Sequence, residues 1–96
     1  MKRLELVRQR RAEIERVASR HGAYNVRVFG SVVREQDSPD SDVDFLVATE
    51  ERTSPWFPAG LVLDLQDLLG CPVEVVTEKG LSPFLRQSIL EEARPL

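Results

Sequence analysis

The sequence has one cysteine, one histidine and one tryptophan, and it has no long apolar run. With Cys71 alone the chain forms no internal disulfide, and no Cys or His lies near it at metal-ligand spacing, so we expect a small packing residue there. No apolar stretch approaches the ~18 residues that span a membrane, and the basic N-terminus lacks the apolar segment of a signal peptide. These absences lead us to expect a cytoplasmic protein.

A basic excess is also lacking, since 13 basic residues stand against 16 acidic ones and the net charge is -3. General nucleic-acid binding, which usually needs a basic excess, is therefore not expected. The first twenty residues are nevertheless rich in arginine. This pattern favours a solvated helix face, with a docking face for an acidic partner or for RNA as the alternative.

Ninety-six residues, 42% of them apolar, predict one folded domain over residues 1–96. A chain of this size buries a single core but has no room for a separate substrate-binding domain. If the chain is an enzyme, it uses a small open site or completes its site with a partner.

Hydrophobic periodicity and turn residues predict alternating helices and strands. Ser82 and Pro83 mark the start of the last helix as N-cap and first helical residue. This order predicts the α+β class, a small mixed sheet of three or more strands with helices packed on it. We expect helices at 4–19, 59–69 and 83–93, strands at 25–29, 43–48 and 73–77, a short helical turn at 32–35 and a loop at 36–41.

Three further details concern the turns and the loop at 49–58. Gly22 is expected to end the first helix in a left-handed conformation, and His21 to place a favourable charge in its last turn. Trp56 and Phe57 lie in the loop, where most aromatic side chains fold back onto the core. We expect both to do so, although an exposed recognition patch is the alternative.

Asp42 and Asp44 flank Val43 where the second predicted strand begins, and an apolar run follows them. Alternate strand residues face the same side about 7 Å apart, so both carboxylates can share one hard cation while Val43 faces the core. Carboxylate oxygens suit Mg²⁺, which keeps water and substrate phosphates as its other ligands. The alternative is a solvated strand end.

Glu74 is an acid in the middle of the otherwise apolar third strand, which makes it the candidate for a third metal-binding carboxylate. It could also simply face solvent on an edge strand. Gly30 and Ser31 follow the first strand, and glycine lets a backbone come close to an anion such as a phosphate. Each feature is weak alone, but their joint occurrence predicts a magnesium and phosphate site.

The Gly30-Ser31 pair followed by Asp42-Val43-Asp44 resembles the signature of the DNA polymerase β-like nucleotidyltransferase superfamily. Arg34, the S-D-V-D-F run and the closing L-S-P-F-L-R-Q-S-I-L-E-E-A resemble its minimal nucleotidyltransferase (MNT) family over nearly the whole chain.

This resemblance implies roles for particular residues. Members of the family use Mg²⁺, take a nucleoside triphosphate, transfer the nucleoside monophosphate and release pyrophosphate. Catalysis and metal binding would fall to Asp42, Asp44 and Glu74, with two ions expected, and nucleotide binding to Gly30, Ser31, Arg34 and Ser41.

The chain is similar to the antitoxin half of HEPN–MNT toxin–antitoxin modules, whose partner is a HEPN ribonuclease toxin encoded nearby. The implied reaction is AMP transfer from ATP to a tyrosine of that toxin, with Glu74 or a magnesium-bound hydroxide as base. A hetero-oligomer with the toxin is expected, and nucleic acid is not expected as a direct partner.

Two alternatives stay open. The first is a non-catalytic antitoxin that neutralises the toxin by binding and occlusion, motivated by Glu74 and Glu35, where relatives have Asp and Gly. The second is transfer to a small molecule or an RNA end, which the basic first helix supports.

Overall fold

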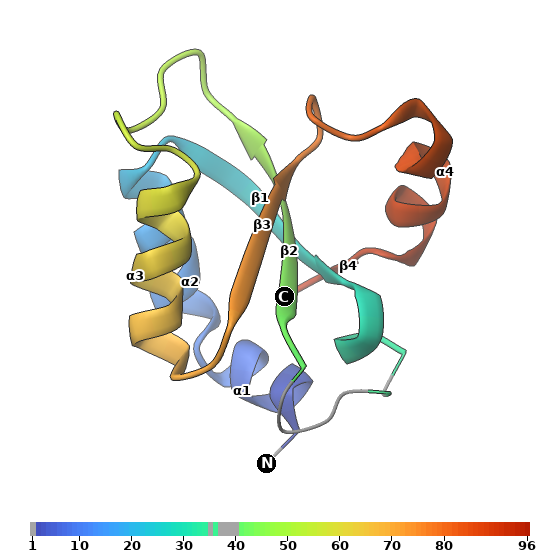
Figure 1. The fold of residues 1–96 in the computed structure, drawn as a ribbon. Helices are drawn as coiled ribbons and strands as arrows, with labels where there is room; N and C mark the ends of the chain where they lie inside the picture. Colours follow the sequence, from blue (N-terminus) through green and yellow to red (C-terminus); the bar gives the residue numbers. More distant parts are fainter. Residues whose placement is uncertain (1, 35, 37–40) are drawn as a thin grey trace.

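A four-stranded mixed sheet forms the centre of the computed structural model, which describes residues 2–34, 36 and 41–96. The predicted fold class is confirmed. The strand order is β3-β2-β1-β4, with β1 antiparallel to both neighbours and β2 parallel to β3 (Figure 1). The strands are β1 (Ala23–Phe29), β2 (Val43–Thr49), β3 (Val73–Thr77) and β4 (Arg94–Pro95).

The predicted N-terminal helix is two helices, α1 (Arg3–Gln9) and α2 (Arg11–Arg20), which corrects the single helix expected at 4–19. The break falls at Arg10, whose φ of -98° and ψ of 14° depart from α-helical geometry. Arg10 and Arg11 form ion pairs with Glu13 at 3.2 Å and Glu15 at 3.0 Å, respectively, and both pairs support the second helix. Gly22 follows α2 with φ +82°, as expected.

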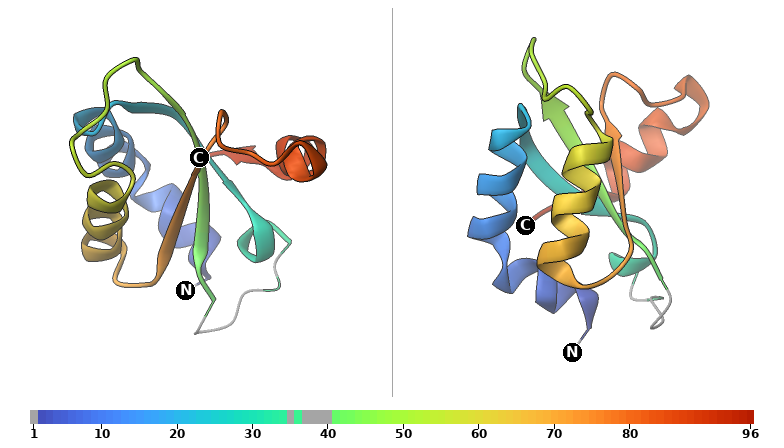
Figure 2. Two further views of the ribbon diagram at one scale, coloured as in Figure 1. Left: turned by 45° about the horizontal axis from the view of Figure 1, so that its top comes forward. Right: turned by 60° about the vertical axis from the view of Figure 1, so that its left-hand side comes forward.

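The main core lies between one face of the sheet and the helices α2 and α3 (Ala59–Leu69). Figure 2 shows both helices on the same side of the sheet. Alternate residues of β2 face this core, so Asp44 and Leu46 face the opposite side. The buried core side chains include Val7, Ile14, Val28, Val43, Phe45, Val47, Leu61, Leu65 and Val75.

The bounds predicted for α3 and β3 are confirmed. Gly70 ends α3 with φ +69°, a conformation that glycine adopts without steric cost. Cys71 follows and is buried in the core, as its sequence context indicated, and burial raises the pKa of its thiol.

The helix α4 (Pro83–Glu92) lies on the other side of the sheet from α2 and α3 (Figure 2). Ser82 caps it by accepting a hydrogen bond from the Phe84 amide at 3.3 Å. None of its residues is buried, and Phe84 is 95% exposed. Its apolar side chains therefore do not pack on the sheet as the expected architecture implied.

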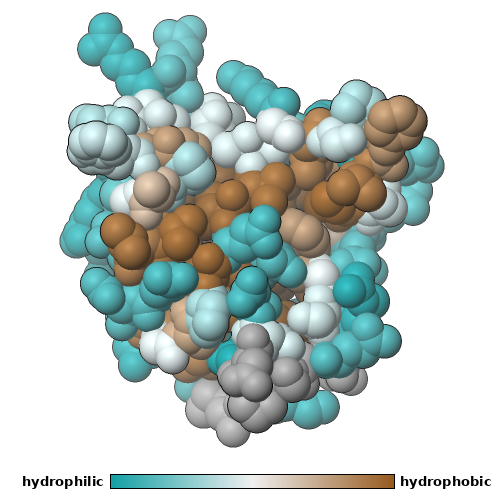
Figure 3. Space-filling model, in the orientation of Figure 1, coloured by the Kyte–Doolittle hydropathy of each residue, from teal (hydrophilic) through white to brown (hydrophobic). Residues whose placement is uncertain are grey.

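Of the two aromatic residues in the loop at 49–58, one packs on the core and the other is exposed. Phe57 packs against the core, but Trp56 is 81% exposed, so the prediction that both fold back was wrong for Trp56. Figure 3 shows an apolar band crossing this face of the molecule from α3 toward α4.

A short strand at the C-terminal end was not predicted. Arg94 and Pro95 pair with Val28 and Arg27 and thereby extend the sheet beyond β1. A short 3₁₀ helix, η1 (Gly30–Val32), follows β1 where a helical turn at 32–35 was expected. Glu35 and most of the predicted loop at 36–41 lie outside the described residues, within which no helix is long and apolar enough to span a membrane.

Candidate active site

Asp44 occupies the centre of the candidate site, between the end of β1 and the start of β3. Its Cα is paired with that of Phe29 on one side and with that of Glu74 on the other. Because paired residues of neighbouring strands face the same side, the Asp44 and Glu74 carboxyl groups lie next to each other on the face that α2 and α3 leave uncovered. Asp42 precedes β2 by one residue and is exposed, as is Glu74 on its edge strand.

The ionisation of Asp44 reflects this crowding. The pKa of its carboxyl is raised to about 6, first by partial burial and then by the charge of Glu74, a hydrogen bond with Glu74 and the charge of Asp42. Arg34 opposes these effects and lowers the same pKa. The two other predicted acids and Arg34 therefore all act on one carboxylate.

Gly30 brings the turn after β1 directly against Asp44. Its φ is +80°, and a Cβ at this position would overlap the Oδ2 atom of Asp44. Only glycine satisfies both conditions at low cost, because it populates positive φ and has no side chain. The Gly30 carbonyl accepts hydrogen bonds from the amides of Val33 and Arg34, at 3.1 and 3.2 Å, which closes the turn.

The other predicted nucleotide-binding residues frame this turn. Ser31 follows Gly30 within η1, and Ser41 is half-buried immediately before Asp42. Arg34 lies just beyond η1, where its guanidinium donates to both carboxylate oxygens of Glu92 at 2.9 and 2.8 Å.

Glu92 was not identified from the sequence. It is the last residue of α4, and its Oε1 atom also accepts a hydrogen bond from the Gly30 amide. Its sequence signal is its place in the closing L-S-P-F-L-R-Q-S-I-L-E-E-A run, within which no spacing sets Glu92 apart.

Comparison with known protein families identifies the family of this chain. The nucleotidyltransferase domain family matches residues 11–96. The chain belongs to the nucleotidyltransferase domain family. Among its relatives, the protein adenylyltransferase MntA of Thermococcus cleftensis is 36% identical over 81 residues, which cover 84% of this chain and 82% of MntA.

Solved structures agree with this assignment. A structure described as a candidate minimal nucleotidyltransferase is 49% identical, with a TM-score of 0.85 over 97% of this nucleotidyltransferase and 95% of that chain. A toxin–antitoxin complex with AMP-PNP is 19% identical, with a TM-score of 0.67 over 98% of this chain and 68% of that one. An MNT antitoxin in complex with the tri-AMPylated HEPN toxin of Shewanella oneidensis is 18% identical. Its TM-score is 0.64 over 99% of this chain and 71% of that chain. The last two likenesses establish the fold.

The donor set of this nucleotidyltransferase fits a divalent cation. Burial raises the pKa of Asp44, the negative charges of Glu74 and Asp42 add to this effect, and a bound cation would offset those charges. Mg²⁺ usually takes one or two protein carboxylates and completes its octahedron with water and phosphate. Among residues 2–34, 36 and 41–96, no three Asp, Glu, His or Cys side chains form a ready-made metal cluster.

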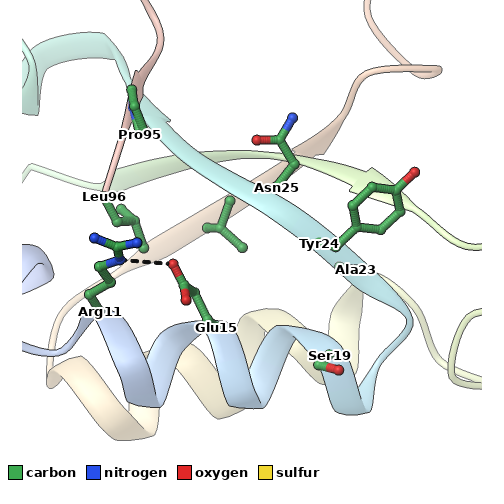
Figure 4. A pocket seen from close by; sticks show the side chains of 9 residues that line it. Arg11, Glu15, Ser19, Ala23, Tyr24, Asn25, Pro95 and Leu96 are labelled. Carbon is green, nitrogen blue, oxygen red and sulfur yellow. Dashed lines mark hydrogen bonds and ion pairs between the residues drawn. The ribbon is translucent and has the colours of Figure 1, made fainter.

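A hollow lies away from these acids. It has a volume of about 370 Å³ and lies between α2, the start of β1 and the C-terminal residues. Figure 4 shows Arg11, Glu15 and Tyr24 at its wall, with the ion pair of Arg11 and Glu15 along the α2 side. None of the predicted site residues lines this hollow, so we do not assign the nucleotide to it.

Proposed function

We propose that this nucleotidyltransferase is a magnesium-dependent protein adenylyltransferase that acts as an antitoxin. It would transfer AMP from ATP to a tyrosine of a HEPN ribonuclease toxin. The observation that carries the proposal is the contact of the Gly30 turn with Asp44, beside Glu74 and Arg34. The identity with MntA, named as a protein adenylyltransferase, supports the choice of AMP and of a protein acceptor.

The site residues would bind the triphosphate, hold the metal and accept the proton in this proposal. The Gly30 and Ser31 turn and the Arg34 guanidinium bind the triphosphate, because backbone amides and a fixed cation both favour an anion. Asp42, Asp44 and Glu74 would hold Mg²⁺, which supplies charge neutralisation at the α-phosphate when bound. Glu74, which is exposed on β3, would also act as the base.

The reaction balances without a further reactant. The tyrosine hydroxyl oxygen bonds to the α-phosphorus, and the bond from that phosphorus to the oxygen bridging to the β-phosphorus breaks. Pyrophosphate leaves with the bridging oxygen, and the phenol proton passes to Glu74. Because the domain has little room for an acceptor pocket of its own, the partner supplies the hydroxyl and part of the site.

The test uses the protein, labelled ATP, Mg²⁺ and the HEPN protein encoded beside it. We expect the label on a toxin tyrosine and its loss when that tyrosine is replaced by phenylalanine. Asp42→Asn with Asp44→Asn should abolish labelling, whereas Asp67→Asn on the exposed surface of α3 should not. Absence of label with folded, wild-type proteins would refute the proposed reaction.

Neutralisation by occlusion is a second candidate, favoured by the exposed apolar side chains Trp56, Leu63, Phe84 and Leu85. Exposed aromatic residues are typical anchors of protein interfaces. The double variant separates the two functions, because it removes two proposed metal ligands and leaves these side chains in place. If it still protects cells and binds the toxin as tightly as the wild type, occlusion suffices.

A further inference from the structure

Glu92 occupies the donors that the proposed function assigns to phosphate. Its Oε1 atom accepts the hydrogen bond from the Gly30 amide. Both of its carboxylate oxygens accept from Nη1 of Arg34, at 2.9 and 2.8 Å. A carboxylate held by one backbone amide and one guanidinium is the arrangement that a phosphate oxygen pair would also take.

The charge of Glu92 adds to an already acidic site. Asp44 is affected by the negative charges of Glu74 and Asp42, and Arg34 is the cation that opposes them. In this structure the Arg34 guanidinium is engaged with Glu92, whose side chain is 28% exposed. A triphosphate approaching the turn would therefore meet a competing anion on its two main donors.

We propose that Glu92 is an internal substitute for a phosphate group, which must rotate away from Gly30 and Arg34 before the triphosphate binds. This inference rests on the proposed nucleotide site and adds to it a residue that sets triphosphate affinity. In the absence of nucleotide, Glu92 keeps the Gly30 amide and the Arg34 guanidinium satisfied and in place.

The surrounding structure allows this exchange without unfolding the helix. Pairing of Arg94 with Val28 fixes the chain two residues beyond Glu92, close to the end of β1. None of the residues of α4 is buried, and the Glu92 side chain is partly exposed. Rotation of the side chain breaks its hydrogen bonds to Gly30 and Arg34, which the incoming phosphate replaces.

The test is binding of inorganic tripolyphosphate and of ATP, each with Mg²⁺, measured by calorimetry on the wild type and three variants. Glu92→Gln keeps an acceptor for the Gly30 amide but removes the charge, and Glu92→Ala removes both. Glu91→Gln is the matched control, because Glu91 neighbours Glu92 on α4 and instead accepts a hydrogen bond from Gln87. Far-UV circular dichroism checks folding.

We expect both Glu92 variants to bind tripolyphosphate and ATP about tenfold more tightly than the wild type, and Glu91→Gln to bind like the wild type. In the amide NMR spectrum of the wild type, tripolyphosphate should shift the Gly30 signal, and Glu92→Ala should shift it without ligand.

Unchanged or weaker binding by Glu92→Gln would overturn the inference and leave Glu92 as a residue that only supports the turn. That result leaves toxin labelling intact, so the proposed function would survive it. Absence of triphosphate binding by every variant overturns both. Tighter binding by the Glu92 variants without AMP transfer overturns only the proposed reaction.

Discussion

Gly30 and Asp44 lie so close together that a methyl group on the glycine would overlap the Oδ2 atom of the aspartate. The turn that follows β1 and the Asp44 side chain of β2 are thus packed directly against each other. Any side chain at position 30 would have to push the Asp44 carboxylate out of its place beside Glu74. The contact joins the proposed phosphate turn to the proposed metal ligands.

Replacing Gly30 by alanine should therefore damage both stability and function. The positive φ strains any residue with a Cβ by about 1–2 kcal/mol, and the overlap with Asp44 adds to that cost. Gly70→Ala is the matched control, because φ is +69° there and nothing lies within 4 Å of the added Cβ. We expect both variants to lose stability in urea unfolding, but only Gly30→Ala to lose ATP binding. Equal ATP binding by the two variants would contradict the proposed role of this contact.

The raised pKa of Asp44 predicts that its charged carboxylate destabilises the metal-free protein. Because the folded-state pKa of about 6 exceeds the ordinary value of 3.8, the folded state binds the proton more tightly than the unfolded state. Stability therefore falls as the pH rises from about 4 to above 6. Asp44→Asn removes this cost and should be more stable than the wild type near pH 7.5, by on the order of 1 kcal/mol after allowance for solvent screening.

Urea unfolding without metal at pH 4, 6 and 7.5 measures this difference, which should shrink toward zero at the lowest pH. Asp67→Asn, an exposed substitution on α3, should show no such trend. Adding Mg²⁺ near pH 7.5 should stabilise the wild type more than Asp44→Asn, because the cation offsets the repulsion that the substitution removes. A variant that is less stable than the wild type at every pH would refute this account.

The sequence predicts the site better than it predicts the surface around it. Asp44 and Glu74 come together because they are paired on neighbouring strands, and alternation within strands is a local rule. Gly30 joins them because it directly follows Phe29, the partner of Asp44 on β1. Gly70 and the apolar face of 59–69 likewise place α3 within the bounds that the structure has. These features depend on short stretches of chain that carry their own signal.

Glu92 and Trp56 depend on long-range packing, which leaves no periodic pattern. Glu92 reaches Gly30 because a two-residue strand, Arg94–Pro95, pairs with β1, and a pairing this short has no recognisable sequence signature. Trp56 stays exposed although tryptophan usually packs, and nothing in its neighbours indicates this. The number of strands and the identity of one site residue therefore required the structure.

His21 connects three parts of the molecule that lie away from the site. Its Nδ1 atom lies 2.6 Å from Oγ of Ser54, and its Nε2 atom lies 2.7 Å from Oδ2 of Asp64. The ring thus joins the end of α2 to the loop before α3 and to α3 itself. The sequence indicated only a favourable charge at the end of a helix.

We expect His21→Ala to lower the free energy of unfolding by about 1–3 kcal/mol, because its ring is mostly buried and both partners lose a hydrogen bond. Ser54→Ala, which removes one of the two contacts, should cost less. Amide hydrogen exchange in the loop at 49–58 should accelerate in His21→Ala, although the amides of Glu50 and Ser54 remain bonded to the Gly22 and His21 carbonyls. ATP binding should be unchanged, since His21 contacts none of the proposed site residues in the part of the chain that the structure describes. Loss of ATP binding in a folded His21→Ala protein would show that this connection supports the site after all.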